Sequence, residues 1–302
     1  MYDIIIIGAG PAGLTSAIYA RRASKKVLVL EAKSYGGQII NTLDIENYPV
    51  EAHISGFDFA TKLYNQAKDL GAEIAFEKVV DINDSGETKE IITTKKTYST
   101  KAVIIATGSE NRKLGLQNED ELVGKGVSYC ATCDGAFYKG KIVAVVGGGN
   151  TALEDALYLS DVASKVYLIH RRDEFRGEES TINLLKSKDN VEFIYNSNIT
   201  KLNASERLNN IEVTNKDGSV KTIDVNGLFV AVGRIPENQN FAKLIDLDES
   251  GYVKAGEDCH TNVSGIFVAG DNRNKEVRQL VTATSDGAVA ATNAVKYINS
   301  LK

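Results

Sequence analysis

Two of the three cysteines of this chain, Cys130 and Cys133, lie close together in the segment SYCATCDGAFYKGK. Asp134 follows directly, and the glycine-rich segment GGGN begins shortly after Lys141. Such a thiol pair can be half of a metal site, a structural disulfide or a redox couple. The carboxyl group of Asp134 could transfer the proton that moves when thiol and thiolate exchange. It could instead cap a helix, and the two roles are compatible.

A zinc site is disfavoured by the remaining ligands. A site with four thiolates is impossible, because Cys259 is the only further cysteine. Adding His260 would complete a site of three cysteines and one histidine, but two adjacent ligands do not match the usual spacing. We therefore expect no metal. We interpret Cys259 as an incidental thiol, because no partner lies near it in the sequence.

The composition is typical of a globular protein. The chain has 302 residues, of which 43% are hydrophobic and 25% charged, and this length is enough for two domains. No apolar run approaches the ~20 residues that span a bilayer, and the N-terminus does not resemble a signal peptide. We therefore expect a cytoplasmic protein without a membrane partner, in which a structural disulfide is rare. A net charge of −5 argues against nucleic acid as a partner.

The first glycine turn lies near the N-terminus. The segment DIIIIGAGPAG indicates a buried strand that ends in the G-x-G-x-x-G spacing, and a helix (LTSAIYARRAS) and a second strand (KVLVLE) follow. Gly8 permits the turn, Gly10 lets the backbone approach a pyrophosphate, and Gly13 lets helix and strand pack closely. The N-terminus of the helix would face the phosphates. Glu31, at the end of the second strand, can bind ribose hydroxyls.

A second glycine turn repeats this pattern with a different charge. In KIVAVVGGGNTA, Gly147, Gly149 and Ala152 give the spacing G-x-G-x-x-A, and a helix (LEDALYLSDVA) and a strand (KVYLIHRR) follow. His170 occupies the position that matches the acidic residue of the first turn. A carboxylate there would repel a 2′-phosphate, whereas the arginines after His170 would bind one. The first turn therefore suits FAD or NAD, and the second suits NADPH.

The order of these segments predicts an α/β protein with two Rossmann-like, three-layer dinucleotide-binding domains. Both glycine turns are followed later by an apolar strand that stops at a glycine, KAVIIATGS and GLFVAVGRIP. The tail, GIFVAGDNRN and a helix beginning near VRQL, is expected to complete the first domain. We expect residues 1–111 and 239–302 to form the FAD domain, and residues 112–238 to form an inserted NADPH domain that carries the thiols. Its two linkers could form a hinge, and DSGETKEIITTKKTYSTK is expected to form exposed antiparallel strands.

Over essentially its whole length the chain resembles the bacterial-type low-molecular-weight thioredoxin reductases. The resemblance rests on the ordered combination of CATCDG, GGGNTALEDALYL and HRRDEFR, together with GAGPAG, GGQIINTLDIENYP, ATGS and FVAGD…VRQL. It implies a homodimeric flavoprotein that uses FAD and NADPH to reduce thioredoxin. It also implies that Cys133 is the thiol nearer the flavin, and that Cys130 attacks the disulfide of thioredoxin. In this family the NADPH domain swings, so that nicotinamide and disulfide take turns at the flavin.

The resemblance further implies which residues hold the two coenzymes. Those expected around FAD are Gly8, Gly10, Pro11, Ala12, Gly13, Glu31, Gly37, Gln38, Asn47, Ala106, Thr107, Gly108, Gly270, Asp271, Arg278 and Gln279. Those expected around NADPH are Gly147, Gly149, Asn150, Thr151, Ala152, His170, Arg171, Arg172 and Arg176, with the arginines at the 2′-phosphate. Two residues depart from the usual family pattern: Ser285 replaces a glycine, and Glu237 is an additional acid.

Three other functions remain as alternatives. Ferredoxin-linked flavin reductases of disulfides resemble this family but lack the NADPH arginines that this chain carries. Reductases of peroxiredoxins usually have an additional N-terminal redox domain, whereas this chain begins at the FAD strand; a glutaredoxin-like acceptor stays open. A flavoprotein scaffold or redox sensor would not need the thiol pair and the arginines together.

Overall fold

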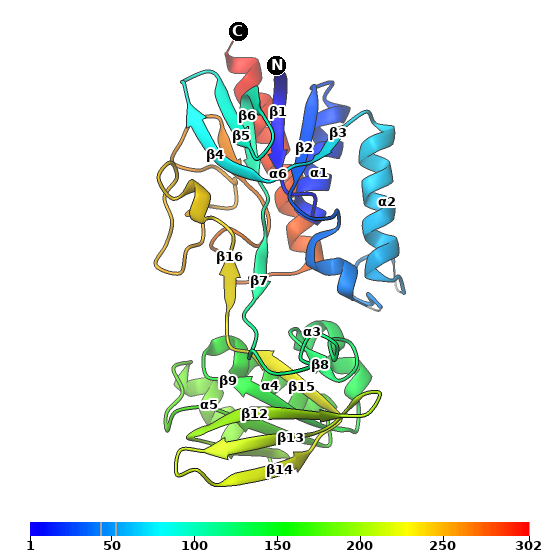
Figure 1. Ribbon diagram of the computed structural model, residues 1–302, viewed down its shortest axis with the longest axis vertical. Coiled ribbons are helices and arrows are strands. Elements are labelled where there is room, and N and C mark those ends of the chain that lie inside the picture. Colours follow the sequence, from blue (N-terminus) through cyan, green and yellow to red (C-terminus); the bar gives the residue numbers. More distant parts are fainter. Residues whose placement is uncertain (43, 52, 302) are drawn as a thin grey trace. The chain divides into compact units, whose positions relative to one another are not determined.

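The structure is a computed structural model and describes residues 1–42, 44–51 and 53–301. It divides into two compact units (Figure 1). Unit 1 comprises Met1–Glu110 and Ile235–Lys302, and unit 2 comprises Asn111–Arg234. Each unit is built around a sheet with parallel strands.

Unit 1 contains a seven-stranded sheet with the order β3-β2-β1-β6-β5-β4, in which β17 also pairs with β6. The strands are β1 (Tyr2–Ile7), β2 (Val27–Glu31), β3 (Glu73–Phe76), β4 (Val79–Asp84), β5 (Lys89–Thr93), β6 (Thr97–Ile105) and β17 (Ile266–Val268). Neighbouring strands from β3 to β6, and β17, run parallel, whereas β4 and β5 are antiparallel to their neighbours. The antiparallel strands predicted for DSGETKEIITTKKTYSTK are confirmed, but Lys89 and Ile91 are buried, so β5 is not wholly exposed.

The long helices cover one face of this sheet, whereas Phe241, in a short helical segment, packs on the other face. The helical segments of unit 1 are α1 (Pro11–Arg22), η1 (Gly37–Asn41), α2 (Gly56–Asp69), η3 (Gln239–Phe241) and α6 (Leu280–Ser300). Because side chains of a strand alternate between faces, Ile4 and Ile6 pack with α1 and α6, whereas Ile5 and Ile7 pack with the opposite core. Ser16 Oγ donates to the carbonyl of Gly287 at 3.0 Å, which holds α1 closely against α6.

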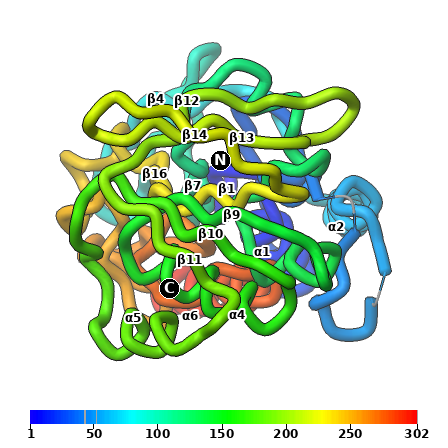
Figure 2. Tube along the Cα trace, turned by 90° about the horizontal axis from the view of Figure 1, so that it is seen from below, coloured from blue at the N-terminus to red at the C-terminus, as the bar shows by residue number. Residues whose placement is uncertain are grey.

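Unit 2 has three layers (Figure 2). Its five-stranded parallel sheet has the order β11-β10-β9-β15-β8, and a three-stranded antiparallel sheet has the order β12-β13-β14. The strands are β8 (Val127–Ser128), β9 (Ile142–Gly147), β10 (Lys165–Ile169), β11 (Val191–Ile194), β12 (Ser197–Ala204), β13 (Leu208–Asn215), β14 (Val220–Asp224) and β15 (Gly227–Ala231). Val143 and Val145 of β9 pack against the helices α4 (Asn150–Val162) and α5 (Glu179–Lys186). Ala144 and Val146 pack against the three-stranded sheet.

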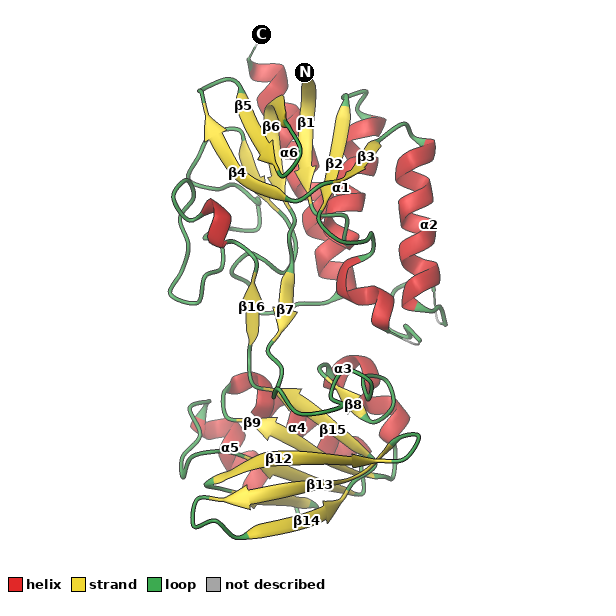
Figure 3. Cartoon of the chain, in the orientation of Figure 1, coloured by secondary structure: helices red, strands yellow, loops and turns green. Residues whose placement is uncertain are grey.

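Two short strands form where the chain passes between the units. β7 (Ser109–Asn111) and β16 (Arg234–Pro236) pair with each other as a two-stranded sheet (Figure 3). The thiol segment belongs to unit 2, where α3 (Ala131–Asp134) and η2 (Gly135–Tyr138) follow β8. Among the described residues, every helix is too short or too polar to cross a membrane.

Candidate active site

Cys130 and Cys133 form a disulfide in unit 2. Their Cα atoms are 5.3 Å apart, and Cys133 lies in the single turn of α3 that Cys130 precedes. Both residues are half-buried, and Cys130 Sγ lies 3.4 Å from Thr132 Oγ1. In this oxidised state neither sulfur is a thiolate that could bind zinc. The spacing of the cysteines therefore produces a bond that can be opened by reduction.

The carboxyl group of Asp134 is held by a serine that precedes the thiols. Ser128 Oγ donates to Asp134 Oδ2 at 2.6 Å and accepts from the Cys130 N–H at 3.1 Å. Burial raises the pKa of Asp134, and the hydrogen bond from Ser128 opposes this shift. The Asp134 side chain makes no capping hydrogen bond at the start of η2, so the geometry does not favour the helix-cap role. A carboxyl that keeps its proton to a higher pH than an ordinary aspartate is suited to transfer a proton to a thiolate.

The first glycine turn lies between the ends of β1 and β6. Gly8 has a φ of 110°, and a Cβ there would lie only 2.3 Å from the Ala106 carbonyl oxygen, so no other residue fits. The Ala9 N–H donates to Glu31 Oε2 at 2.8 Å, which fixes this carboxylate beside the turn. Gly10, by contrast, would carry a Cβ with only Gly37 Cα near it, at 3.9 Å. The turn is therefore open in front of α1, as a pyrophosphate requires.

Distant segments expected around FAD meet at the same end of the sheet. Asn47 Nδ2 donates to Gln279 Oε1 at 3.2 Å, which joins the loop before α2 to the residue before α6. A Cβ on Gly270 would lie 2.9 Å from Ala12 Cβ, so the loop after β17 touches the start of α1. The guanidinium of Arg278 lies over the ring of Tyr252, 4.3 Å from its centre. The remaining expected residues of this group, Pro11, Gly13, Gln38, Thr107, Gly108 and Asp271, all belong to unit 1.

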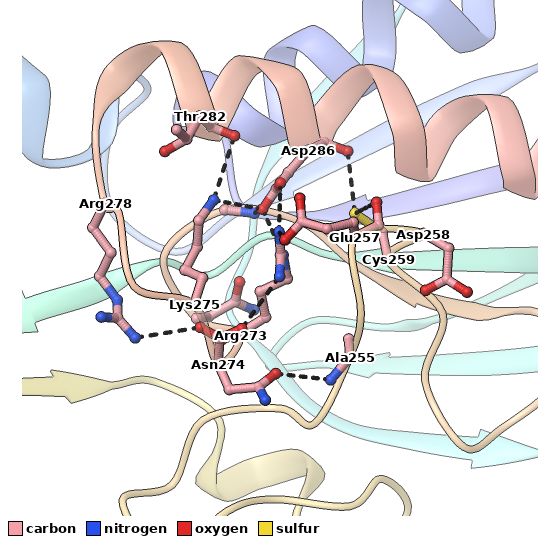
Figure 4. A network of polar contacts seen from close by, with 12 residues as sticks. Ala255, Glu257, Asp258, Cys259, Arg273, Asn274, Lys275, Arg278, Thr282 and Asp286 are labelled. Carbon is pink, nitrogen blue, oxygen red and sulfur yellow. Dashed lines mark hydrogen bonds and ion pairs between the residues drawn. The ribbon is translucent and has the colours of Figure 1, made fainter.

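Buried ion pairs hold the loop after β17, and the sequence motifs did not predict them (Figure 4). Arg273 Nε and Lys275 Nζ lie 2.8 and 2.9 Å from Asp286 Oδ2. The Gly270 N–H donates to the same oxygen at 3.0 Å. Burial opposes ionisation of Asp286, but the hydrogen bonds from Arg273 and Lys275 outweigh it and lower the pKa of this carboxyl. The network fixes the residues next to Asp271.

Cys259 lies beside this network in unit 1, whereas the disulfide belongs to unit 2. Its Sγ is 3.7 Å from the Asp286 carbonyl oxygen (Figure 4). The side chain is fully buried, and this burial, assisted by the charge of Asp286, raises the pKa of the thiol to about 12. A thiol that stays protonated in this way is a poor nucleophile. The geometry agrees with an incidental thiol.

The second glycine turn closes over the ring of His170. A Cβ on Gly147 would lie 2.4 Å from the Ala231 carbonyl oxygen. A Cβ on Gly8 would approach the Ala106 carbonyl oxygen of unit 1 in the same way. The His170 ring stacks on Phe175, and burial lowers the pKa of His170. Its Nε2 is buried and has no hydrogen-bond partner in the described part of the chain. A Cβ on Gly148 would lie 2.0 Å from His170 Cε1, so the neutral ring packs directly beneath the turn.

The arginines lie at the rim of this turn. Arg171, Arg172 and Arg176 are exposed, and the Arg176 N–H donates to the Gly148 carbonyl at 2.8 Å. A Cβ on Gly149 would meet nothing within 4 Å, so the turn is open in front of α4. The other expected residues of this group, Asn150, Thr151 and Ala152, form the first turn of α4. An arginine whose backbone is bonded to an open turn, with two more arginines directly after His170, suits a dinucleotide with an additional phosphate.

One cluster in unit 1 has the composition of a metal site. Asp44, Glu46 and His53 place their ligand atoms within 4.8 Å of one another. His53 Nδ1 lies 2.9 Å from Asp44 Oδ2, and this hydrogen bond raises the pKa of His53. His53 is exposed, as expected, and so is His260. An ion pair at the surface accounts for the cluster.

Comparison with known proteins identifies the family. The model of the family described as pyridine nucleotide-disulphide oxidoreductase matches residues 2–287. A thioredoxin reductase of Listeria innocua is 44% identical over 304 residues, which cover 100% of this chain and 95% of that protein. A thioredoxin reductase of Bacillus subtilis is 41% identical, over 100% of this chain and 96% of that protein. The chain belongs to the thioredoxin reductase family.

Structural similarity agrees with this assignment to the thioredoxin reductases. The crystal structure of thioredoxin reductase from Streptococcus pyogenes is 39% identical, with a TM-score of 0.95 and 99% of each chain covered. The predicted α/β fold with two Rossmann-like domains and the predicted family are thereby confirmed. As a member of this family, the protein is a flavoprotein oxidoreductase that uses FAD and NADPH. The open glycine turns, Glu31 and the three arginines fit these two groups.

Proposed function

We propose that this protein is a thioredoxin-disulfide reductase. It passes electrons from NADPH through FAD to the Cys130–Cys133 disulfide, and from there to oxidised thioredoxin. The observation that carries this proposal is the disulfide itself, which stands next to the buried carboxyl of Asp134 in a chain with two open glycine turns. Bound FAD and NADPH supply hydride transfer. The exchange with thioredoxin is carried out by residues of the chain.

The thiol chemistry balances as follows. Reduction of the disulfide takes up two electrons and two protons and gives two thiols. The thiolate of Cys130 attacks one sulfur of the thioredoxin disulfide, which gives a mixed disulfide and a thiolate on thioredoxin. The thiolate of Cys133 then attacks Cys130, which releases reduced thioredoxin and restores the starting disulfide. Asp134, held by Ser128, takes and returns the proton at Cys130 and the leaving thiolate.

We assign the two coenzymes to different units. FAD binds at the turn of unit 1, with its pyrophosphate at Gly10 and α1 and a ribose at Glu31. The residues around Asp271, Arg278 and Gln279 lie towards the ribityl chain and the isoalloxazine. NADPH binds at the turn of unit 2, with its 2′-phosphate at Arg171, Arg172 and Arg176. The support is the open backbone at both turns and the different charge near the matched positions, a carboxylate at Glu31 in unit 1 and the arginines that follow His170 in unit 2.

The arrangement of the chain supports a rotating domain. The disulfide and the NADPH turn both belong to unit 2, whereas the residues assigned to FAD belong to unit 1. Because one flavin must exchange electrons with both, unit 2 rotates about β7 and β16 between the two reactions. A cross-link that fixes the units to each other should stop turnover and leave FAD bound. Undiminished turnover by the cross-linked protein would contradict this rotation.

Assembly and location follow from the same assignment. The protein is a homodimer of the cytoplasm, where NADPH and thioredoxin are available to it. Membership of the thioredoxin reductase family supports both statements. Analytical ultracentrifugation of the flavin-loaded protein should give twice the mass of the chain. A monomer at micromolar concentration would contradict the dimer.

A coupled assay tests the function. The purified yellow protein should oxidise NADPH in proportion to the disulfide of thioredoxin that is reduced. Parallel assays with a glutaredoxin and with a peroxiredoxin distinguish other acceptors. Turnover with either of those proteins, and none with thioredoxin, would overturn the proposal.

A further inference from the structure

A second carboxyl group approaches the thiol segment from helix α4. Asp155, Tyr158 and Leu159 share one face of this helix, because residues three and four positions apart are neighbours. A Cβ on Gly135, the residue after Asp134, would lie 2.6 Å from Tyr158 Cε1 and 3.2 Å from Leu159 Cδ2. The turn that carries the thiols therefore packs directly on this face of α4.

Asp155 contacts the backbone between the two cysteines. The backbone N–H of Ala131, the residue directly after Cys130, lies near enough to the Asp155 carboxyl to favour its ionised form. Ala131 is fully buried and belongs to the same core cluster as Leu153 and Ala156 of α4. A charge on Asp155 therefore acts on the half-buried sulfur atoms across a fully buried residue, where electrostatic effects are less screened than in bulk water.

We propose that Asp155 sets the thiolate pKa and the reduction potential of the Cys130–Cys133 couple through the backbone between the two cysteines. This role is separate from that of Asp134, which hydrogen-bonds with Ser128. It rests on the proposed function, because it requires that the cysteine pair is a redox couple. Asp155 is thus a positioning residue: it holds the thiol turn and imposes a charge on it, but it does not exchange a bond with thioredoxin.

The sign of the effect follows from the charge. Reduction converts one disulfide, two electrons and two protons into two thiols, one of which then loses its proton to become the attacking thiolate. An ionised Asp155 repels this thiolate, raises the pKa of the thiol and makes the disulfide harder to reduce. A protonated Asp155 has no such effect. The couple is therefore more reducing while Asp155 is charged, which favours electron transfer to thioredoxin.

The charge of Asp155 changes within the working pH range. Burial raises the pKa of Asp155 to about 7, while Arg234 of β16 opposes this shift and Glu154 of α4 adds to it. On elements packed against α4, Asp134 of α3 helps to raise the pKa of Tyr138 of η2, and Arg207 opposes that shift; α5 adds Glu179 and Lys186, and β10 adds Lys165. The effect on the thiols is therefore expected above neutral pH and absent in mild acid.

The test compares variants of the flavin-loaded enzyme. It measures the reduction potential of the Cys130–Cys133 couple and the pKa of the Cys130 thiol, and it does not rely on turnover. Asp155→Asn keeps the shape of the side chain and an oxygen near the Ala131 N–H but removes the charge. Asp155→Glu keeps the charge, and Asp161→Asn removes a matched carboxylate from the exposed end of α4, where it pairs with Lys188.

Each protein is equilibrated without oxygen in dithiothreitol redox buffers and alkylated, and the free thiols are counted by mass spectrometry. The rate of Cys130 alkylation by iodoacetamide, measured against pH, reports the thiolate pKa.

At about pH 8.5 the disulfide of Asp155→Asn should be reduced up to about tenfold more readily than that of the wild type, a shift of about 30 mV. The difference should vanish near pH 6, where Asp155 is protonated. Asp155→Glu and Asp161→Asn should match the wild type throughout. A shift that is the same at every pH, or no shift, would overturn the proposal. If Asp155→Asn does not retain FAD, Asp155→Ser gives the same readout. A wild-type pair that NADPH cannot reduce would instead refute the proposed function.

Discussion

The two glycine turns share a backbone design but differ in the side chain at the end of the second strand. In unit 1 the Glu31 carboxylate accepts the Ala9 N–H at 2.8 Å, so a negative charge is bound to the turn itself. In unit 2 the matched side chain, His170, is buried against Phe175 with a lowered pKa. The positive charge there comes from exposed arginines. We therefore propose that the glycines allow a dinucleotide to bind and that the residues at the end of the second strand select which dinucleotide it is.

The largest expected effect is the loss of thioredoxin reduction when either cysteine of unit 2 is replaced, while FAD binding in unit 1 is kept. Cys130→Ser and Cys133→Ser each remove one sulfur of the disulfide, so both variants should lose all measurable reduction of thioredoxin. FAD should stay bound, because its assigned residues lie in unit 1. Coupled assays and the visible spectrum of the purified variants check this. Thioredoxin turnover by either variant would remove the disulfide from the mechanism.

A second difference between the units is the buried ion-pair network that holds the loop after β17 in unit 1. Asp286→Asn leaves the buried Arg273 and Lys275 without their carboxylate, which should lower the free energy of unfolding by about 3 kcal/mol or more. The folded pKa of Asp286 is lowered, so its contribution is present above the unfolded value of 3.8 and is lost as pH falls through the folded value. Urea unfolding at several pH values measures this. Equal stability of wild type and variant at neutral pH would show that the network does not stabilise unit 1.

The arginines should distinguish NADPH from NADH. A charge-assisted hydrogen bond contributes about 1.5–3 kcal/mol, and each ~1.4 kcal/mol is a factor of ten. Replacing Arg171 and Arg176 by glutamine should therefore raise the KM for NADPH by roughly a hundredfold. The KM for NADH should barely change, since it lacks the 2′-phosphate. Equal losses for both coenzymes, in steady-state kinetics, would mean that these arginines support the fold.

The smallest expected effect concerns the carboxylate of unit 1. Glu31→Gln keeps the size of the side chain but weakens its hydrogen bonds, so the affinity for FAD should fall by roughly tenfold. The KM for NADPH should stay the same, because its assigned site lies in unit 2. Titration of apoprotein with FAD measures the first quantity. An altered KM for NADPH with unaltered FAD affinity would reverse the assignment of the two turns.

The features that the sequence predicted are those set by short-range chemistry. Strand–turn–helix segments and the spacing of Cys130 and Cys133 are local, so the fold class and the family could be recognised from them. The helix of the tail begins at Leu280, the last residue of the expected VRQL, because Gln279 and Thr282 form a capping box there.

The features that were missed depend on tertiary packing. Ser128 lies only six residues before Asp134, but its role depends on how the chain turns at the disulfide. Asp155 and Asp286 lie on helices whose sequences do not show what packs against them. A carboxyl among apolar helix positions, as at Asp286, is the one sequence signal that could have pointed to a buried ion pair.

Anaerobic titration with NADPH tests the central claim most directly, because it counts the electron acceptors of the protein. The flavin accepts one pair of electrons and the Cys130–Cys133 disulfide accepts another. The wild type should therefore take up a second pair beyond that needed to bleach the flavin, and should return electrons to added oxidised thioredoxin. Cys130→Ser should stop after the first pair and return none to thioredoxin. Uptake of a single pair by the wild type, or equal uptake by both proteins, would contradict the account.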